Sequence, residues 1–248
     1  MTASLLRTAL APLLLAVLCG PTAAQRSIAP AGHAWAMYFG THRLANSWNL
    51  QTEYQWRRAD WGAVWQQSLL RVGLERSTPS GAAFTAGYGW IRTFPYGEQP
   101  IADVTDEHRI WEQVAVQQEL GRVRLHHRYR FEQRFLETAS GHVLRHRVRY
   151  RAAATVPLRG PLFLTVYDEV FAGWGPGIAR NVLDQNRLYA ALGYRLSPSL
   201  QIQAGYLNQI VLKPDGLRAE NNHTLQLGIF HSLDLRGQEP EPRAPGLN

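Results

Sequence analysis

Between residues 48 and 57 apolar and polar side chains alternate along the chain. One set consists of Trp48, Leu50, Thr52, Tyr54 and Trp56, and the other of Asn49, Gln51, Glu53, Gln55 and Arg57. Only a β-strand, whose successive side chains point to opposite faces, turns this order into one apolar and one polar face. This part of the chain is therefore expected to form a strand of a two-faced sheet.

The alternation returns at 122–134, where charged residues separate apolar ones, and similar segments follow one another along the chain. Turn-forming Gly, Pro, Ser and Asp residues lie between them. The predicted strands are about 33–40, 47–58, 63–76, 82–93, 107–120, 122–135, 142–156, 161–172, 184–197, 199–212 and 222–235. Most of them are long enough to cross a bilayer as tilted strands, which takes roughly 9 residues or more.

No apolar segment after residue 25 approaches the roughly 20 residues that a spanning helix needs. A chain that crosses a membrane without such a helix must form a closed barrel, because only helices and barrels satisfy every backbone group in lipid. We therefore predict an all-β fold, an antiparallel transmembrane β-barrel of about 10 (10–12) strands. A soluble periplasmic barrel of the lipocalin type is an alternative, because soluble sheets alternate too.

The two ends of the chain differ in composition from its centre. Arg7, the apolar run 9–18 and the small residues 22–24 are typical of a cleaved signal peptide. Residues 236–248 contain three prolines and little apolar material, which predicts a disordered tail. The expected organisation is a signal peptide at 1–24, an outer-membrane barrel at 25–235 and a tail at 236–248.

The connections between predicted strands alternate in length. Outer-membrane barrels have short periplasmic turns and longer external loops. This favours external positions for 94–106, 136–141, 173–183 and 213–221. Ten strands follow, and 33–40 is left as an odd eleventh element, so that either this segment does not span the membrane or one strand is missing. The loops 94–106 and 173–183 are the expected contact surface.

Several motifs occur together in a fixed order. They are Glu-His-Arg-Ile-Trp-Glu-Gln at 107–113, His-Arg-Tyr-Arg-Phe-Glu-Gln-Arg at 127–134, Asp-Glu-Val-Phe at 168–171, Asp-Gln-Asn-Arg-Leu-Tyr-Ala-Ala-Leu-Gly-Tyr at 184–194 and Gly-Tyr-Leu-Asn at 205–208. With this set the chain, over roughly 33–235, resembles a bacterial barrel family catalogued only as a domain of unknown function. The resemblance implies an outer-membrane barrel and no particular activity.

In a barrel the polar face of these strands lines the interior. The side chains expected to form a charged interior network are Glu53, Arg109, Glu119, Arg122, Arg124, Arg128, Arg130, Glu132, Arg134, Arg145, Arg147, Arg149, Arg151, Glu169 and Arg187. The favoured hypothesis is a structural salt-bridge network that plugs a narrow lumen. The alternative is a small anion or small-solute pathway lined by guanidinium groups, supported by the excess of arginine over acid.

Two features of the outer face need a structural answer. On 107–120, placing Arg109 inside sends Glu112 and Gln118 toward lipid, unless a β-bulge near 111–112 or a position at the rim intervenes. Aromatic residues near predicted strand ends suggest girdles at the membrane interfaces. They include Trp35, Tyr38, Trp48, Trp56, Trp61, Trp65, Tyr88, Trp90, Tyr96, Phe171 and Trp174.

We expect no enzymatic activity, no cofactor and no metal site. The alternative is an outer-membrane phospholipid or lipid A hydrolase, for which Ser68, His142 or His146 with an acid are the available groups. Nucleic acid is not an expected partner despite the net charge of +7, because the arginines alternate along strands of an exported chain. The expected partners are outer-membrane lipid, lipopolysaccharide and the outer-membrane assembly machinery, and the chain is expected to be monomeric.

Overall fold

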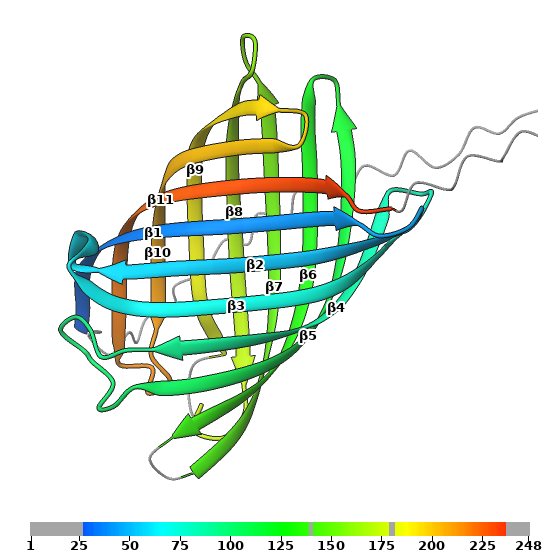
Figure 1. Ribbon diagram of the computed structural model, residues 1–248. Coiled ribbons are helices and arrows are strands. Elements are labelled where there is room, and N and C mark those ends of the chain that lie inside the picture. The colour runs from blue at the N-terminus through cyan, green and yellow to red at the C-terminus, as the bar shows by residue number, and fades with distance from the viewer. Residues whose placement is uncertain (1–26, 139–140, 179–181, 237–248) are drawn as a thin grey trace, which may run out of the picture.

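A computed structural model describes residues 27–138, 141–178 and 182–236. In this part of the chain eleven strands form one closed barrel (Figure 1). They are β1 (Ser27–Arg43), β2 (Trp48–Ala59), β3 (Val64–Ser77), β4 (Ala82–Thr93), β5 (Thr105–Leu120), β6 (Val123–Thr138), β7 (Gly141–Pro157), β8 (Leu162–Trp174), β9 (Leu183–Ser197), β10 (Leu200–Leu212) and β11 (Arg218–Asp234). A short 3-10 helix, Asp60–Gly62, joins β2 to β3. The described residues include no helix that could cross a membrane.

The all-β barrel is confirmed, and its strand number lies within the predicted range. The predicted signal peptide (1–24) and the predicted tail beyond Arg236 lie outside the described residues. The segment 33–40 proves to be the centre of a full strand, β1, so neither of the two explanations offered for an odd element is right. All eleven strands take part in the wall.

An odd strand number is possible because the barrel closes with one parallel pair. Strands that alternate in direction leave the first and the eleventh running the same way, so these two can meet only in parallel. β1 pairs with β11 over its whole length, from Ser27 beside Arg218 to Arg43 beside Asp234. All other neighbours are antiparallel, and Figure 1 shows β1 lying between β2 and β11. Parallel pairing is slightly weaker per residue than antiparallel pairing, so a long seam is an advantage.

The alternation read from 48–57 places the side chains as predicted. On β2, Tyr54 and Trp56 are 43% and 39% exposed, whereas Gln55 and Arg57 between them are 5% and 8% exposed. Large apolar side chains cover the outer wall of the other strands as well. Examples are Leu70, Val72, Phe84, Ile110, Tyr129, Val148, Leu188, Leu192, Tyr206, Leu225 and Leu227. The outer surface is thus mainly apolar and the inner surface mainly polar, which is the pattern of a transmembrane β-barrel.

β5 keeps the conflict over its outer face, because it has no bulge and Glu112 lies near the middle of the strand and not at the rim. Its register with β4 and β6 is unbroken, so the bulge considered at Trp111 and Glu112 is absent from this strand. Glu112 instead lies exposed on the outer wall, opposite Phe131 of β6. Trp111 is buried inside, and a Cβ at Gly87 of β4 would lie 2.5 Å from its ring. The glycine makes room for the indole within the wall.

The aromatic residues near strand ends divide between the two faces. Trp56, Trp61, Trp65 and Trp174 are exposed on the outside, where Trp56 and Trp65 meet edge to face at 5.9 Å. Tyr96, also assigned to the girdles, lies inside the barrel and contacts Glu220 of β11. Trp35 and Phe171 are likewise buried inside the barrel, at 3% and 1% exposure. Each lies on the same face of its strand as inward-pointing polar residues. Aromatic character alone does not show to which face of a strand a side chain belongs.

The connections gather at two ends of the barrel. The short-turn end carries 44–47, 78–81, 121–122, 158–161 and 198–199. The long-loop end carries 60–63, 94–104, 175–182 and 213–217, together with the β6–β7 connection. Because β1 and β11 are parallel, Ser27 lies at the long-loop end and Asp234 at the short-turn end.

Candidate functional site

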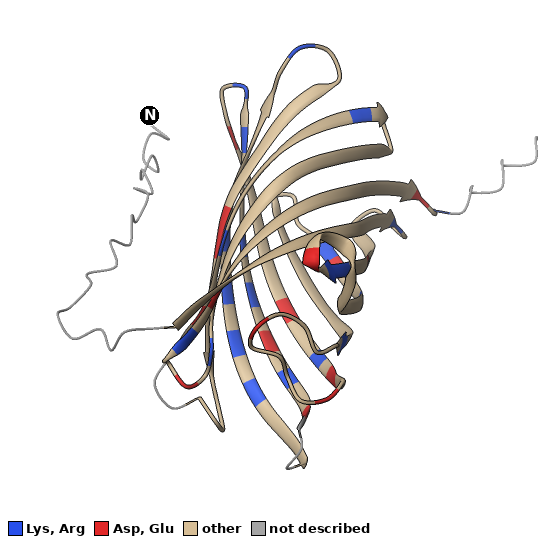
Figure 2. Ribbon diagram, turned by 90° about the vertical axis from the view of Figure 1, so that its left-hand side faces the viewer, with Lys and Arg blue, Asp and Glu red and all other residues tan. Residues whose placement is uncertain are grey.

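The inner face of β6 and β7 carries an unusual set of cross-strand neighbours. Arg128 lies directly opposite Arg151, Arg130 opposite Arg149, and Arg134 opposite Arg145. Like charges opposite one another destabilise a sheet unless other groups compensate them. Glu132, opposite Arg147, is the acidic residue among these positions. Figure 2 shows the charged positions gathered on a group of neighbouring strands.

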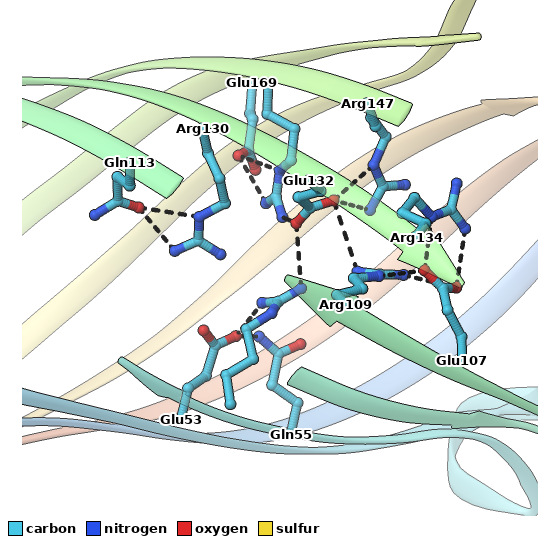
Figure 3. Close-up of polar contacts among 12 residues, drawn as sticks. Glu53, Gln55, Glu107, Arg109, Gln113, Arg130, Glu132, Arg134, Arg147 and Glu169 are labelled. Carbon is cyan, nitrogen blue, oxygen red and sulfur yellow. Dashed lines mark hydrogen bonds and ion pairs between the residues drawn. The ribbon is translucent and has the colours of Figure 1, made fainter. Parts of the chain in front are cut away.

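Glu132 is the centre of the compensation. Its side chain is fully buried, and its two carboxylate oxygens accept hydrogen bonds from Arg149 at 2.8 Å and from Arg147 at 2.6 Å. Arg71 of β3 and Arg109 of β5 approach the same carboxylate to 3.6 and 3.8 Å. Figure 3 shows Arg109 and Arg147 beside Glu132, with dashed lines from both to its carboxylate. One carboxylate thus links β6 and β7 to β3 across the lumen.

Two further glutamates extend the chain of ion pairs. Glu53 of β2 accepts a hydrogen bond from Arg71 at 2.8 Å. Glu169 of β8 accepts hydrogen bonds from Arg128 at 2.6 Å and from Arg149 at 2.8 Å. The Glu169 carboxylate also lies 3.9 Å from Arg187 of β9. The ion pairs therefore run without interruption from β2 to β9.

The remaining part of the cross-section is filled by aromatic and apolar side chains. The guanidinium groups of Arg57 and Arg187 lie 4.1 and 5.4 Å from the ring centroid of Trp35 on β1, within the range of cation–π contacts. Beside Trp35 an apolar cluster lies inside the barrel. It comprises Trp35, Met37, Tyr189, Ala191 and Leu207, with Phe39 and Tyr167 packed against it. Charged and apolar groups together occupy the middle of the lumen.

A second carboxylate cluster lies toward the long-loop end. Glu107 of β5 binds both Arg109 on its own strand and Arg134 of β6, with the Arg134 Nε at 2.7 Å. Asp184 of β9 accepts a hydrogen bond from Arg147 at 3.1 Å. These contacts join the central cluster to the mouth of the barrel.

The connection 94–104 is tied to the lumen wall through one side chain. The Tyr96 hydroxyl donates a hydrogen bond to Glu220 of β11 at 3.3 Å, and its ring meets His33 of β1 edge to face. Burial and the neighbouring Glu220 carboxylate raise the pKa of the Tyr96 hydroxyl, so it remains a donor. Lys213 also pairs with Glu220, which anchors the β10–β11 connection at the same place.

Two cavities lie inside the barrel, one on each side of the cluster. The outer cavity, about 330 Å³, opens toward the long-loop end and is lined by Arg57, Tyr96, Glu107 and Asp184 among others. The inner cavity, about 650 Å³, opens toward the short-turn end. The charged residues Glu53, Arg71, Arg128 and Arg151 border both. The ion-pair cluster is therefore the partition between the two cavities.

The structure brings together most of the residues predicted from the sequence. Those in the described ion-pair cluster are Glu53, Arg109, Arg128, Glu132, Arg134, Arg147, Arg149, Glu169 and Arg187. Arg130 and Arg151 face the lumen, but neither has an ion pair with a described acid; Arg130 instead binds the Gln113 amide oxygen at 2.7 Å.

Four predicted residues lie apart from this cluster. Glu119 and Arg124 form an exposed pair 3.5 Å apart near the short-turn end, and Arg122 is exposed in the turn beside them. Arg145 donates to the Pro176 carbonyl at 2.9 Å in the β8–β9 connection. Glu119, Arg124 and Arg145 have the predicted phase but lie near the ends of their strands, and Arg122 lies in the turn between β5 and β6. All four are therefore beyond the partition.

The sequence analysis did not assign Arg71, Glu107 and Asp184 of the cluster, nor Arg57, which lies beside the cluster on Trp35 without an ion pair to a described acid. Arg57 and Glu53 share the polar face of β2, and Glu107 lies two residues before Arg109, so strand phase could have included both. Arg71 is less apparent, because it is the charged residue between Leu69 and Gly73 on an inner face that is otherwise mixed.

The groups considered for a lipid hydrolase are not assembled. Ser68 lies on the outside of β3, where its hydroxyl contacts Tyr54 at 3.4 Å. His146 lies on β7, stacked on Phe131 and Trp174. Four strand spacings separate β3 from β7, which is roughly 19 Å around the wall. His142 is on β7 as well.

Fold and interior define a closed β-barrel with an apolar outer wall and an ion-pair partition. The chain belongs to the family DUF2490, described as a protein of unknown function, whose model matches residues 32–231. This confirms the resemblance drawn from the sequence motifs. A search of the curated proteins finds no match.

Among solved structures the chain is similar to OmpT, an outer membrane protein of Vibrio cholerae. The in-vitro folded protein matches at 14% identity and a TM-score of 0.40, over 71% of this chain and 56% of that one. A loop L8 deletion mutant of the same protein matches at 13% identity and a TM-score of 0.40, over 66% of this chain and 54% of the other. This chain thus spans little more than half the length of either structure.

Proposed function

We propose that this chain is an outer-membrane β-barrel whose lumen is closed at mid-height, a structural envelope protein and not an open channel. The observation that carries the proposal is the position of Glu132, fully buried and contacted by arginines of β3, β5 and β7. A chain of ion pairs that reaches across the lumen leaves two blind cavities. The lumen of a barrel with many more strands would be too wide for side chains to close in this way.

The outer wall supports the membrane assignment. Leu188, Leu225 and Phe84 are 60%, 56% and 52% exposed, and they belong to an apolar surface that surrounds the barrel. Monomeric soluble proteins rarely expose contiguous apolar patches beyond a few hundred Å². A soluble lipocalin-type protein would carry polar residues on this surface. In the proposed orientation the long-loop end faces outward, toward lipopolysaccharide, and the short-turn end faces the periplasm.

Membrane fractionation tests the compartment. Membranes from cells that express the full chain are washed with urea, and the protein is followed by immunoblotting. We expect it to stay with the outer-membrane fraction, since an integral barrel is held by its apolar wall. Release into the wash would favour the soluble alternative and contradict the proposal.

Planar-bilayer recording tests the closed lumen. Refolded protein is inserted into a bilayer, and insertion is verified separately by protease protection. We expect no steady current, because the ion pairs around Glu132 and Glu169 fill the cross-section. A steady current from inserted wild-type protein would show an open path and overturn the proposal.

A further inference from the structure

The inner cavity is lined by more arginine than glutamate side chains. It is lined by Arg71, Arg124, Arg128, Arg130 and Arg151, and its acidic lining residues are Glu53 and Glu75. Glu53 is paired with Arg71, whereas Glu75 accepts hydrogen bonds from the amides of Asn49 and Gln51 and keeps its charge. Even with that charge counted, the arginines outnumber the acids. The uncompensated charge of the cavity is therefore positive.

Two of these arginines are the candidates to bind an anion. Arg130 is 5% exposed, and Arg151 faces the same cavity from the neighbouring strand. Within the described residues neither forms an ion pair with an acid, and each lies opposite another arginine, Arg130 opposite Arg149 and Arg151 opposite Arg128. On its other side Arg151 lies opposite Glu169 of β8, whose carboxylate is bound by Arg128 and Arg149. A buried guanidinium group beside another cation is costly unless an anion joins it.

Hydrogen-bond donors at the cavity wall are left without acceptors. Among the described residues no partner exists for the Nη1 of Arg130 or for the Nε of Arg128 and of Arg151. The indole Nε1 of Trp111, which lines the same cavity, also lacks one. These four nitrogens are themselves buried, so an acceptor in the cavity would reach them only after a side chain turns. Buried polar groups nearly always have partners, and these donors therefore leave an unmet demand for acceptors beside the cavity.

The rest of the wall is aromatic. Tyr167 and Tyr189 are stacked with ring centroids 4.7 Å apart, and Phe39 and Phe230 are stacked at 5.0 Å. All four line the inner cavity. Its volume of about 650 Å³ is that of a typical small-molecule site. Apolar walls with a few convergent polar groups are what such sites present.

We propose that the inner cavity binds an aromatic carboxylate, with its carboxylate group held by Arg130 and Arg151 and its ring against the tyrosine and phenylalanine pairs. Guanidinium groups match carboxylates in shape and charge, which favours this anion. The inference rests on the proposed function, since the partition is what makes the cavity a blind pocket. The ligand would enter from the short-turn end.

Calorimetric titration of the refolded chain in zwitterionic detergent micelles tests the proposal. Benzoate is the probe, benzyl alcohol is its uncharged counterpart, and inorganic phosphate is an anion without a ring. We expect saturable binding of benzoate, at least tenfold weaker binding of phosphate and no binding of benzyl alcohol. Absence of benzoate binding up to about 10 mM, or equal binding of benzyl alcohol, would overturn the proposal.

Variants locate the site. Arg130→Gln and Arg151→Gln should each weaken benzoate binding at least tenfold, which is about 1.4 kcal/mol. Arg57→Gln is the matched control, because Arg57 lines the outer cavity and also has no ion pair with a described acid. It should change the affinity less than twofold. Arg151 borders both cavities, so the comparison of Arg130→Gln with Arg57→Gln decides between them. Loss of binding with Arg57→Gln but not with Arg130→Gln would place the anion in the outer cavity and refute the assignment.

A second pair of variants covers the case in which an arginine substitution prevents folding. Ala153 lines the inner cavity, so Ala153→Trp should fill it and abolish binding without a change in charge. Ala152→Trp, on the outer face of the same strand, is the control and should bind as the wild type does. Unchanged binding in Ala153→Trp would exclude this cavity. Bilayer recordings report on the closed lumen separately, so a conducting barrel and a barrel that fails to bind benzoate give different results.

Discussion

At the residue scale, the central fact is that one carboxylate compensates several guanidinium groups. Glu132 has no exposed side-chain surface, and Arg147, Arg149, Arg71 and Arg109 all lie within 4 Å of it. A buried ion pair contributes little net stability when it is complete, because desolvation offsets the attraction. Removal of one partner is strongly destabilising, since the charge of the other partner then remains buried and uncompensated.

Glu132→Gln should therefore destabilise the barrel by about 3–5 kcal/mol, because the arginines around it would lose their counter-charge. Unfolding in urea, followed by circular dichroism in detergent, measures this loss. Glu119→Gln is the control, since Glu119 forms an exposed pair with Arg124 and should cost less than about 1 kcal/mol. Equal effects of the two substitutions would show that the buried position of Glu132 is unimportant.

At the element scale, β1 decides the architecture. Its neighbours are β2 on one side and β11 on the other, and the β11 pairing is parallel over the full length of both strands. Without β1 the remaining ten strands would be even in number and could close with an antiparallel pair. The odd count is therefore a consequence of one strand, which also supplies Trp35 and Met37 to the interior.

The parallel seam predicts a specific cross-link. Ala36 of β1 and Leu227 of β11 are register partners, and both face outward. In a Cys19→Ser background, Ala36→Cys with Leu227→Cys should form a disulfide under mild oxidation, detected as a mobility shift on unreduced gels. Ala36→Cys with Ile210→Cys, one strand farther at β10, should not. A cross-link in the second pair alone would place β1 elsewhere in the wall.

At the scale of the whole molecule, the lumen is two cavities and a partition. Eleven strands lie between the roughly eight whose interior side chains fill completely and the 16–18 of open porins. The space that remains is enough for cavities of about 330 and 650 Å³ at the two ends. Most of the arginines would stay in place if the partition were thinned, so the resulting path would be positively charged.

Removal of the partition should therefore create an anion-selective path. The double variant Glu132→Ala, Arg149→Ala deletes one acid and one base that bond at 2.8 Å, and it should conduct anions in planar bilayers where the wild type does not. Reversal potentials in a salt gradient measure the selectivity. The rim pair Glu119→Ala, Arg124→Ala is the control and should remain silent. Cation-selective current from the first variant would contradict the positive lumen.

The alternation of side chains along each strand is what allowed interior residues of the site to be predicted. The period of two assigned Glu132, Arg147 and Glu169 to the interior, because in a regular strand every second residue shares a face. It also assigned Glu119 and Arg145 there, since phase says nothing about height along the barrel axis. The chain of contacts from Arg71 to Glu132 joins β3 to β6, and no local pattern carries that information.

The sequence by itself determined the barrel, its two faces and the identity of the charges inside, because alternation and strand length are properties of neighbouring residues. Only the tertiary structure decided the parallel closure by β1, the convergence on Glu132 and the separation of the two cavities. These depend on which strands meet and at what register, and the registers of all strands are set together when the sheet closes.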